Sequence, residues 1–242
     1  MRSTRVILHT VLALTGLGLR AQDTTQAGNG WSIGVSGALD VCYRTTVVVE
    51  EGQHTDLLVD MRNDMEIQRT SFTAGVDVEY AFNDHWIMAT GMQFSDRGYG
   101  TEAQELIAID FEPFVIGTAE WEYHYRFMSF PFMVRYSIGN GAWRFLPSTG
   151  IWIDRLHEKF TRWTITHTDG SHDTGRSTFG NVDFNDWGAS ACLELPVSVA
   201  LCDRVDLRFG PRARYQFTQL TNTPITDHLW EGGFLLGAMI RL

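Results

Sequence analysis

The sequence is poor in lysine and lacks any long apolar run after its N-terminal segment. Lys159 is the one lysine among 19 basic residues, and the formal net charge of the 242 residues is −10. A chain with this acidic balance is not expected to bind nucleic acid. Because no apolar run of about 18 residues follows residue 21, a membrane-spanning helix is excluded.

Cysteine is scarce too, and its odd count of 3 excludes a complete disulfide framework. Cys192 and Cys202 lie on one predicted strand, roughly 33 Å apart at the usual rise of a strand, which is too far for a disulfide. We therefore expect Cys42, Cys192 and Cys202 to be small buried thiols.

Residues 1–21 are predicted to be a signal peptide. Arg2 and Arg5 precede an apolar stretch over residues 6–19, and Ala21 stands before the cleavage point. This stretch is too short to span a bilayer, and the alternative interpretation is a buried N-terminal helix. The mature chain is expected to be exported, and to begin with a flexible periplasmic leader over residues 22–30.

The remainder is rich in apolar, aromatic and glycine residues, which favours a folded β-protein over a disordered chain. Eight segments alternate between large apolar residues and small or charged ones, which is the period of a β-strand. From Trp31 to Arg44, for example, the odd positions are mostly large and apolar. The segments cover residues 31–44, 72–82, 86–97, 128–136, 143–154, 186–199, 205–217 and 230–242.

The connections between these segments alternate in length. Short turns are expected at Asn83-Asp84, Gly139-Asn140-Gly141 and Cys202-Asp203. Long polar loops are expected over residues 45–68, 98–119, 157–181 and 218–227. This asymmetry is typical of an outer-membrane barrel. We predict an eight-stranded antiparallel up-and-down transmembrane β-barrel over residues 31–242, with residues 31–44 paired to residues 228–242 and both termini in the periplasm.

A soluble lipocalin-like ligand carrier would show a similar alternation, with its large apolar residues pointing inward. Two features favour the membrane barrel. The polar face is rich in small residues that suit a narrow interior, and aromatic residues gather near strand ends as an interfacial girdle does. The girdle comprises Trp31, Tyr43, Phe82, Trp86, Trp143, Trp187 and Trp230. Four prolines interrupt the predicted strands and are expected at bulges or near the rims, namely Pro131, Pro147, Pro196 and Pro211.

The segment from Tyr125 to Phe132, the following Gly139-Asn140-Gly141 turn and the signal peptide ending at Ala21-Gln22 resemble the PorT-like outer-membrane β-barrel family. The resemblance covers the mature chain and is one of pattern. It implies contact with outer-membrane lipid and with the barrel-assembly machinery, and an accessory role in protein secretion or a surface role. The chain ends in Leu242, where such families usually carry an aromatic residue.

Charged residues on the polar faces are predicted to form a network inside the barrel. Acids and arginines balance there, and arginine satisfies a buried carboxylate with two hydrogen bonds. We expect a structural plug of salt bridges, and the alternative is a proton or ion path. The acids are Asp40, Asp77, Glu79, Asp154, Asp186, Glu194, Asp206 and Glu231. The bases are Arg44, Arg97, Arg135, Arg144, Arg208, Arg212, Arg214 and Arg241.

The third long loop holds a candidate metal site. Asp169-Gly170 is a type I′ turn signal, which would set His167 directly opposite His172, with Asp173 nearby. Two imidazoles on one face suit a metal ion, and the alternative is a solvated hairpin tip that extends the barrel wall.

Enzyme motifs are absent: there is no G-x-S-x-G, H-E-x-x-H or C-x-x-C pattern and no glycine-rich phosphate loop. We expect neither catalysis nor a cofactor. The alternative is a lipid-modifying enzyme with a Ser-His pair at the membrane rim, for which His85, His124 and His228 are the candidate histidines.

The long loops are the expected recognition surface of the barrel. Residues 98–119 are unusually apolar for a loop and are the candidate surface for an envelope protein partner. The loops are also rich in acids, which suit divalent cations or a basic partner.

Overall fold

The computed structural model describes residues 30–50, 55–108, 114–180 and 182–242. The signal peptide predicted for residues 1–21 and the leader up to residue 29 lie outside the described residues. One helix and twelve strands form the described fold: β1 (Gly30–Val48), α2 (Thr55–Met65), β2 (Glu66–Ala81), β3 (Trp86–Thr101), β4 (Gln104–Ala108), β5 (Phe114–Tyr136), β6 (Trp143–Phe145), β7 (Ser148–His167), β8 (His172–Ser177), β9 (Trp187–Glu194), β10 (Val197–Cys202), β11 (Val205–Gln216) and β12 (Ile225–Arg241).

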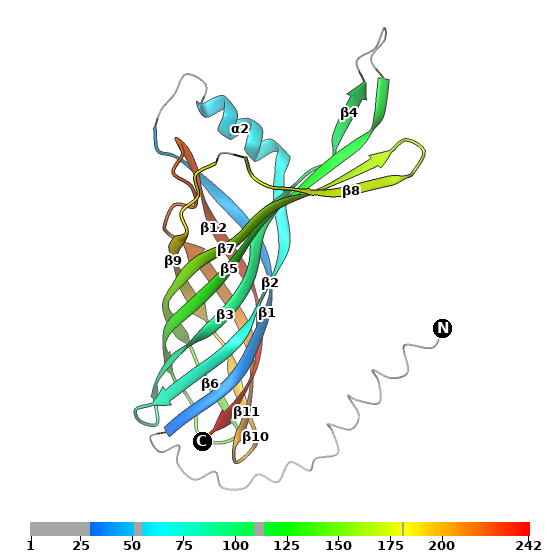
Figure 1. The fold of residues 1–242 in the computed structure, drawn as a ribbon. Helices are drawn as coiled ribbons and strands as arrows, with labels where there is room; N and C mark the ends of the chain where they lie inside the picture. Colours follow the sequence, from blue (N-terminus) through cyan, green and yellow to red (C-terminus); the bar gives the residue numbers. More distant parts are fainter. Residues whose placement is uncertain (1–29, 51–54, 109–113, 181) are drawn as a thin grey trace, which may run out of the picture.

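The strands close into an eight-stranded antiparallel barrel, in the order β12-β1-β2-β3-β5-β7-β9-β11 with β11 paired back to β12 (Figure 1). The predicted closure is confirmed, because β1 pairs with β12 from Ser32 opposite Arg241 to Thr45 opposite His228. Within the described residues no helix has the length and hydropathy to cross a membrane.

Prolines interrupt two of the eight barrel strands without changing the register in which these strands pair. Pro147 falls between β6 and β7, and Pro196 falls between β9 and β10. The register is the same on both sides of these breaks, and the Leu146 N–H donates to the Pro196 carbonyl at 2.8 Å. The fifth and sixth predicted strands therefore each act as one strand of the barrel, made of β6 with β7 and of β9 with β10. Pro131 and Pro211 lie inside β5 and β11, where the pairing is regular. The register shift of β5 falls near Arg126, so the bulge expected at a proline is not at Pro131.

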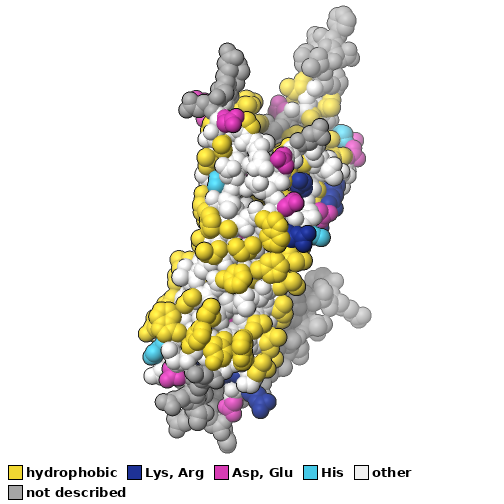
Figure 2. Space-filling model, turned by 60° about the vertical axis from the view of Figure 1, so that its left-hand side comes forward, with side chains coloured by type: hydrophobic (Ala, Val, Ile, Leu, Met, Phe, Trp, Pro, Cys, Tyr) yellow, Lys and Arg dark blue, Asp and Glu magenta, His cyan; other side chains and the backbone are white. Residues whose placement is uncertain are grey.

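The large apolar residues point out of the barrel and the small or charged ones point in. On β1 the outward residues Val35 and Leu39 are 58% and 70% exposed, whereas Asp40 between the walls is 2% exposed. Figure 2 shows apolar side chains over much of the lower part of the barrel on the face in view, and we call this surface the apolar belt. This arrangement is the reverse of a lipocalin-like carrier, so that alternative is wrong.

The short connections lie where the sequence predicts them, at the end of the barrel where β1 begins and β12 ends (Figure 1). Gly139 and Gly141 have φ angles of +102° and +110°, which side chains with a Cβ rarely adopt. The turn at residues 139–141 therefore needs its glycines.

The long connections are more ordered than predicted. Residues 45–68 contain α2, which the sequence analysis treated as loop. Residues 98–119 and 157–181 are largely strand, because β3, β5 and β7 continue far beyond the apolar belt. Above the barrel, β4 pairs with β5, β5 with β7 and β7 with β8. We call β4, β8 and the parts of β5 and β7 that pair with them the projecting sheet; these parts are residues 114–119 and 161–166. Figure 1 shows this sheet leaning away from the barrel axis.

The predicted burial of all three cysteines is wrong at one position. Cys42 and Cys192 are buried in the barrel, whereas Cys202 is exposed at the end of β10. This strand end lies next to the turn at residues 203–204, and among the described residues its thiol is open to solvent.

Substitution Gly98→Ala is expected to lower the free energy of unfolding by about 1–3 kcal/mol. Gly98 has a φ of +149°, and an added Cβ would lie 1.8 Å from the Tyr123 carbonyl oxygen. Gly100→Ala is the matched control on the same strand, because its Cβ would lie 3.6 Å from the nearest atom, Cγ1 of Ile67. Urea unfolding in detergent micelles measures both. Equal stability of the two variants would contradict the argument.

Candidate functional site: the charged lumen and the projecting sheet

Arg212 is at the centre of the lumen network. Its guanidinium donates to both carboxylate oxygens of Asp40, at 2.9 and 2.5 Å, and to the Thr73 hydroxyl at 2.6 Å. A second carboxylate, that of Glu231, lies 3.3 Å away. These side chains come from β11, β1, β2 and β12, so Arg212 ties several barrel strands together across the interior.

A second group surrounds Asp154 on β7. Arg214 donates to it, Arg97 lies 3.1 Å from its other oxygen, and the Ser190 hydroxyl donates at 2.5 Å. The ring of Trp152 lies 4.2 Å from the Arg214 guanidinium. Trp152 breaks the alternation read from the sequence because it is a lumen residue, 3% exposed, that packs beneath the arginines.

The lower lumen is filled in the same way. Arg208 donates twice to Glu79, and Arg135 bridges Glu79 and Glu194 at 3.3 Å each. At the end that carries the C-terminus, Asp206 accepts from Arg144 at 2.9 Å and from Arg241 at 2.5 Å. Asp77 accepts from the Gln93 amide at 2.8 Å instead of from an arginine.

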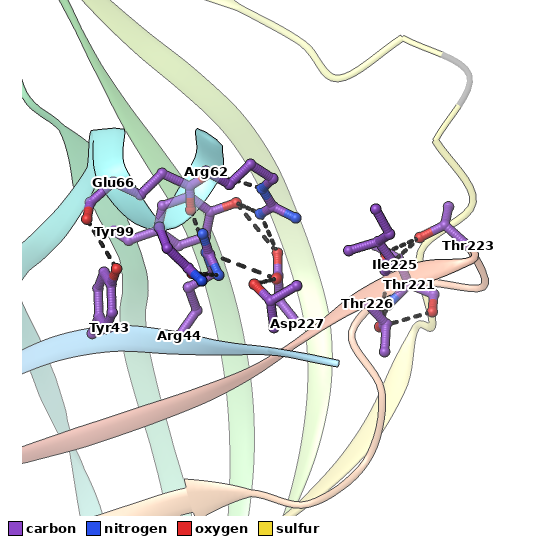
Figure 3. Close-up of polar contacts among 12 residues, drawn as sticks. Tyr43, Arg44, Arg62, Glu66, Tyr99, Thr221, Thr223, Ile225, Thr226 and Asp227 are labelled. Carbon is purple, nitrogen blue, oxygen red and sulfur yellow. Dashed lines mark hydrogen bonds and ion pairs between the residues drawn. The ribbon is translucent and has the colours of Figure 1, made fainter. Parts of the chain in front are cut away.

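A further cluster closes the opposite mouth of the barrel, beneath α2 (Figure 3). Arg62 reaches from α2 to Asp227 at 2.7 Å, to Glu66 at 2.8 Å and to the Tyr99 hydroxyl at 3.0 Å. Arg44 also donates to Glu66. Burial lowers the pKa of Arg62, but the interactions with Tyr99, Asp227 and Glu66 outweigh it and hold the pKa above its ordinary value. The charge therefore persists and pins α2 over the mouth.

The structure brings together all but one of the predicted lumen residues. Asp186 is the exception, because it precedes β9 and is exposed to solvent, so its prediction as a lumen acid is wrong. Arg62, Glu66 and Asp227 were missed because residues 45–68 and 218–227 were read as loops. Their signal in the sequence was the pair Arg62 and Glu66, spaced by one helical turn.

Little space remains between these side chains. A cavity lined by Asp77, Arg135 and Glu194 has a volume of about 20 Å³, which is room for roughly one water molecule. Among the described residues this packing of paired charges fits the predicted structural plug, because an eight-stranded barrel is just wide enough for its side chains.

The projecting sheet places the two candidate metal histidines on opposite faces, with Asp173 on the face of His167. His172 pairs with Thr166, and the His167 N–H donates to the Ser171 carbonyl, so the register differs by one residue from the prediction. The turn spans residues 168–170, with Gly170 at φ +83°, instead of the two residues expected. Because a shift of one residue moves a side chain to the other face, His167 and His172 do not converge.

The remaining contacts of this hairpin are ordinary surface pairs. His167 lies 2.9 Å from Asp173, and His172 lies 3.0 Å from the Thr166 hydroxyl. Hydrogen bonds from the hydroxyl and N–H of Ser171 hold the pKa of Asp169 below its usual value. Within the part of the chain that the structure describes, no group of three metal-ligating side chains converges.

The rim histidines do not form the Ser-His pair that a lipid-modifying enzyme would need. His85 and His228 contact backbone carbonyls of Ser137 and Gln216. His124 is 4% exposed and lies 3.0 Å from Asp96. In the described residues, none of these imidazoles contacts a serine hydroxyl.

Comparison with known proteins bears on the barrel as a whole. Residues 20–223 match the family model described as outer membrane protein beta-barrel domain. No curated protein sequence matches the chain. Similar solved structures include Neisserial surface protein A, with 13% identity, TM-score 0.45 and coverage of 88% of this chain and 97% of that one. OprG from Pseudomonas aeruginosa has 11% identity, TM-score 0.36 and coverage of 89% and 97%. The outer membrane protease OmpT from Escherichia coli has 7% identity, TM-score 0.41 and coverage of 93% and 100%.

Proposed function

The chain belongs to the outer membrane protein β-barrel domain family, and we propose that it is a closed barrel that binds a protein partner through its projecting sheet. In the proposed orientation both termini lie in the periplasm and the projecting sheet lies outside the cell. The observation that carries the proposal is a contrast: paired charges fill the lumen, whereas β5 and β7 continue beyond the apolar belt into the projecting sheet.

Two properties of the projecting sheet suit a polypeptide partner. In the described residues β4 pairs only with β5 and β8 only with β7, so both are edge strands with free backbone groups. An extended segment of another protein adds to such an edge through main-chain hydrogen bonds. The adjoining residues Ile107, Val115 and Ile116 are 54%, 44% and 37% exposed, which adds apolar area to the edge.

An accessory role in protein secretion is a finer form of this proposal. The resemblance to PorT-like barrels implies this role. An exposed strand edge outside the cell would also suit an extended polypeptide that emerges from a neighbouring secretion complex. Contacts with the barrel-assembly machinery belong to the biogenesis of the protein and form part of the same proposal.

Photocrosslinking in whole cells tests the partner. A photoreactive residue at Ile107 is expected to capture a reproducible protein adduct. Leu201 is the matched control, because it has the same 54% exposure but lies at the other end of the barrel. The proposal is wrong if Ile107 captures no protein or if both positions capture the same one.

A trimmed variant separates recognition from folding. Short Gly-Ser turns replace residues 103–118 and 164–174, which leaves β3 paired with β5 up to Gly100 opposite Glu122. The variant is expected to keep its folded mobility on unheated gels. A photoreactive residue at Trp121, beside the cut, is expected to capture the partner in the full-length protein and to capture none in the trimmed variant. Retention of the adduct would locate recognition outside the projecting sheet.

A further inference from the structure

Basic residues outside the lumen gather on one side of the barrel. Arginines from β5, β7 and β8 lie on the outward face of these strands where the projecting sheet begins, and we call them the stem patch. The stem patch comprises Arg126, Arg155, Arg162 and Arg176, which lie in the outward row of Met128 and in the outward rows beyond it. Figure 2 shows several Lys and Arg side chains, with Asp and Glu side chains among them, at one side of the molecule above the apolar belt.

The strand register fixes the height of the stem patch. Phe94, Met128, Arg155 and Trp187 are paired side by side across β3, β5, β7 and β9. Phe94 and Trp187 are 37% and 56% exposed, so this row is the last one of the apolar belt. The next outward row, about 7 Å higher, is Asp96, Arg126 and Glu158. It lies two residues further along β3 and β5, and three residues further along β7 because the register shifts near Arg126. The boundary between hydrocarbon and headgroups therefore falls between the two rows.

Arg155 is the residue that points to a ligand. It stands in an apolar row, and among the described residues it forms no ion pair; its guanidinium lies 5.7 Å from the Trp187 ring. An arginine in this position extends its stem along the wall and its charge toward the headgroups. There the nearest available anions are lipid phosphates.

The neighbouring arginines are held in place and keep donors to spare. Arg126 and Arg176 lie 4.9 and 3.7 Å from the ring of Phe160, which is buried against the wall. Both also donate to Glu158. Arg126 also donates to Asp96 at 3.4 Å. A guanidinium carries five N–H donors, so these carboxylates leave several donors of each arginine for a second anion. The acids that pair with arginines of the stem patch are Asp96, Glu122 and Glu158, and Arg155 pairs with none of them.

We propose that Arg126, Arg155 and Arg176 form a binding site for the phosphate group of a membrane lipid in the leaflet on the side of the projecting sheet. Guanidinium groups bind phosphate oxygens in bidentate pairs, and Phe160 and Trp187 hold the guanidinium groups at the membrane surface. The site would fix the rotation and depth of the barrel, and with them the direction in which the projecting sheet points. The inference depends on the membrane barrel and is independent of the protein partner.

The test uses the full-length protein in phosphatidylcholine nanodiscs that contain either phosphatidic acid or diacylglycerol with the same acyl chains. Native mass spectrometry counts the lipids that stay bound. The wild-type protein is expected to retain phosphatidic acid and to release diacylglycerol. Arg155→Gln is expected to weaken retention about fivefold, the ratio for loss of roughly 1 kcal/mol per basic residue at a membrane surface.

Arg204→Gln is the matched control, since it removes one exposed arginine at the opposite end of the barrel. It is expected to leave retention unchanged, while the triple variant Arg126→Gln/Arg155→Gln/Arg176→Gln loses it. Arg155→Gln breaks no ion pair among the described residues, so it remains informative if the triple variant misfolds. Equal retention of both lipids by the wild type, or wild-type retention in Arg155→Gln, would overturn the proposal. Displacement of the lipid by an equal concentration of inorganic phosphate would also do so, because it would show a site for soluble anions.

Discussion

Substitution Arg212→Ala is expected to lower the free energy of unfolding by about 3–5 kcal/mol, the usual cost of removing one partner of a buried ion pair. The variant leaves the buried carboxylate of Asp40 without its partner, since Asp40 is 2% exposed and accepts two hydrogen bonds from Arg212. Glu231 keeps Arg214 at 3.4 Å, so Asp40 bears most of the loss. Urea unfolding in detergent micelles, followed by the shift between folded and unfolded bands on a gel, measures the change.

A second substitution distinguishes a stranded charge from a simple cavity. Asp40→Asn in the Arg212→Ala background removes the unpaired carboxylate and is expected to recover part of the lost stability. Arg204→Ala removes an exposed arginine and is expected to leave stability within about 0.5 kcal/mol of wild type, as surface substitutions usually do. A double variant no more stable than Arg212→Ala would show that electrostatics does not account for the loss.

The purified protein is expected to show no steady conductance in a planar lipid bilayer. Charged side chains from facing barrel strands meet along the whole lumen, from Asp206 near one end to Asp227 at the other. An eight-stranded barrel leaves an interior just wide enough for its side chains, so ions find no water-filled path.

The same recording decides whether α2 or the lumen closes the barrel. A variant in which a short Gly-Ser linker replaces residues 51–65 lacks Arg62 and the cover over the mouth. It is expected to stay closed, because the contacts of Arg212, Arg214 and Arg208 lie below and do not involve α2. Steady current through the variant alone would identify α2 as a gate, and steady current through the wild type would contradict the plug.

The alternation of large apolar with small or charged residues determined the number of barrel strands and their inward and outward faces. The reason is that a strand reverses its face at every residue, so a run such as residues 31–44 already shows which side chains meet lipid. The lengths of the connections determined the end at which the short turns lie. The closure of β1 on β12 followed from the same patterns. The composition of the lumen was also predictable, because a narrow interior accepts only small residues and paired charges.

The tertiary structure alone decided which charges pair. Arg212 and Asp40 are 172 residues apart in the chain and meet only because the barrel closes. Asp186 shares the alternation of its segment but lies outside, since β9 begins one residue later. The hairpin at residues 167–172 differs by one residue from the turn signal, and this single step separates His167 from His172.

Order beyond the belt was likewise a matter of tertiary structure. The segments at residues 98–119 and 157–181 were predicted to be loops because nothing local distinguishes a solvated strand from a solvated loop. They form a sheet because β5 and β7 leave the barrel already paired, and each added residue extends that ladder from Arg126 opposite Glu158 to Gly117 opposite His167. The arginines of the stem patch, scattered along the sequence, meet on one wall for the same reason.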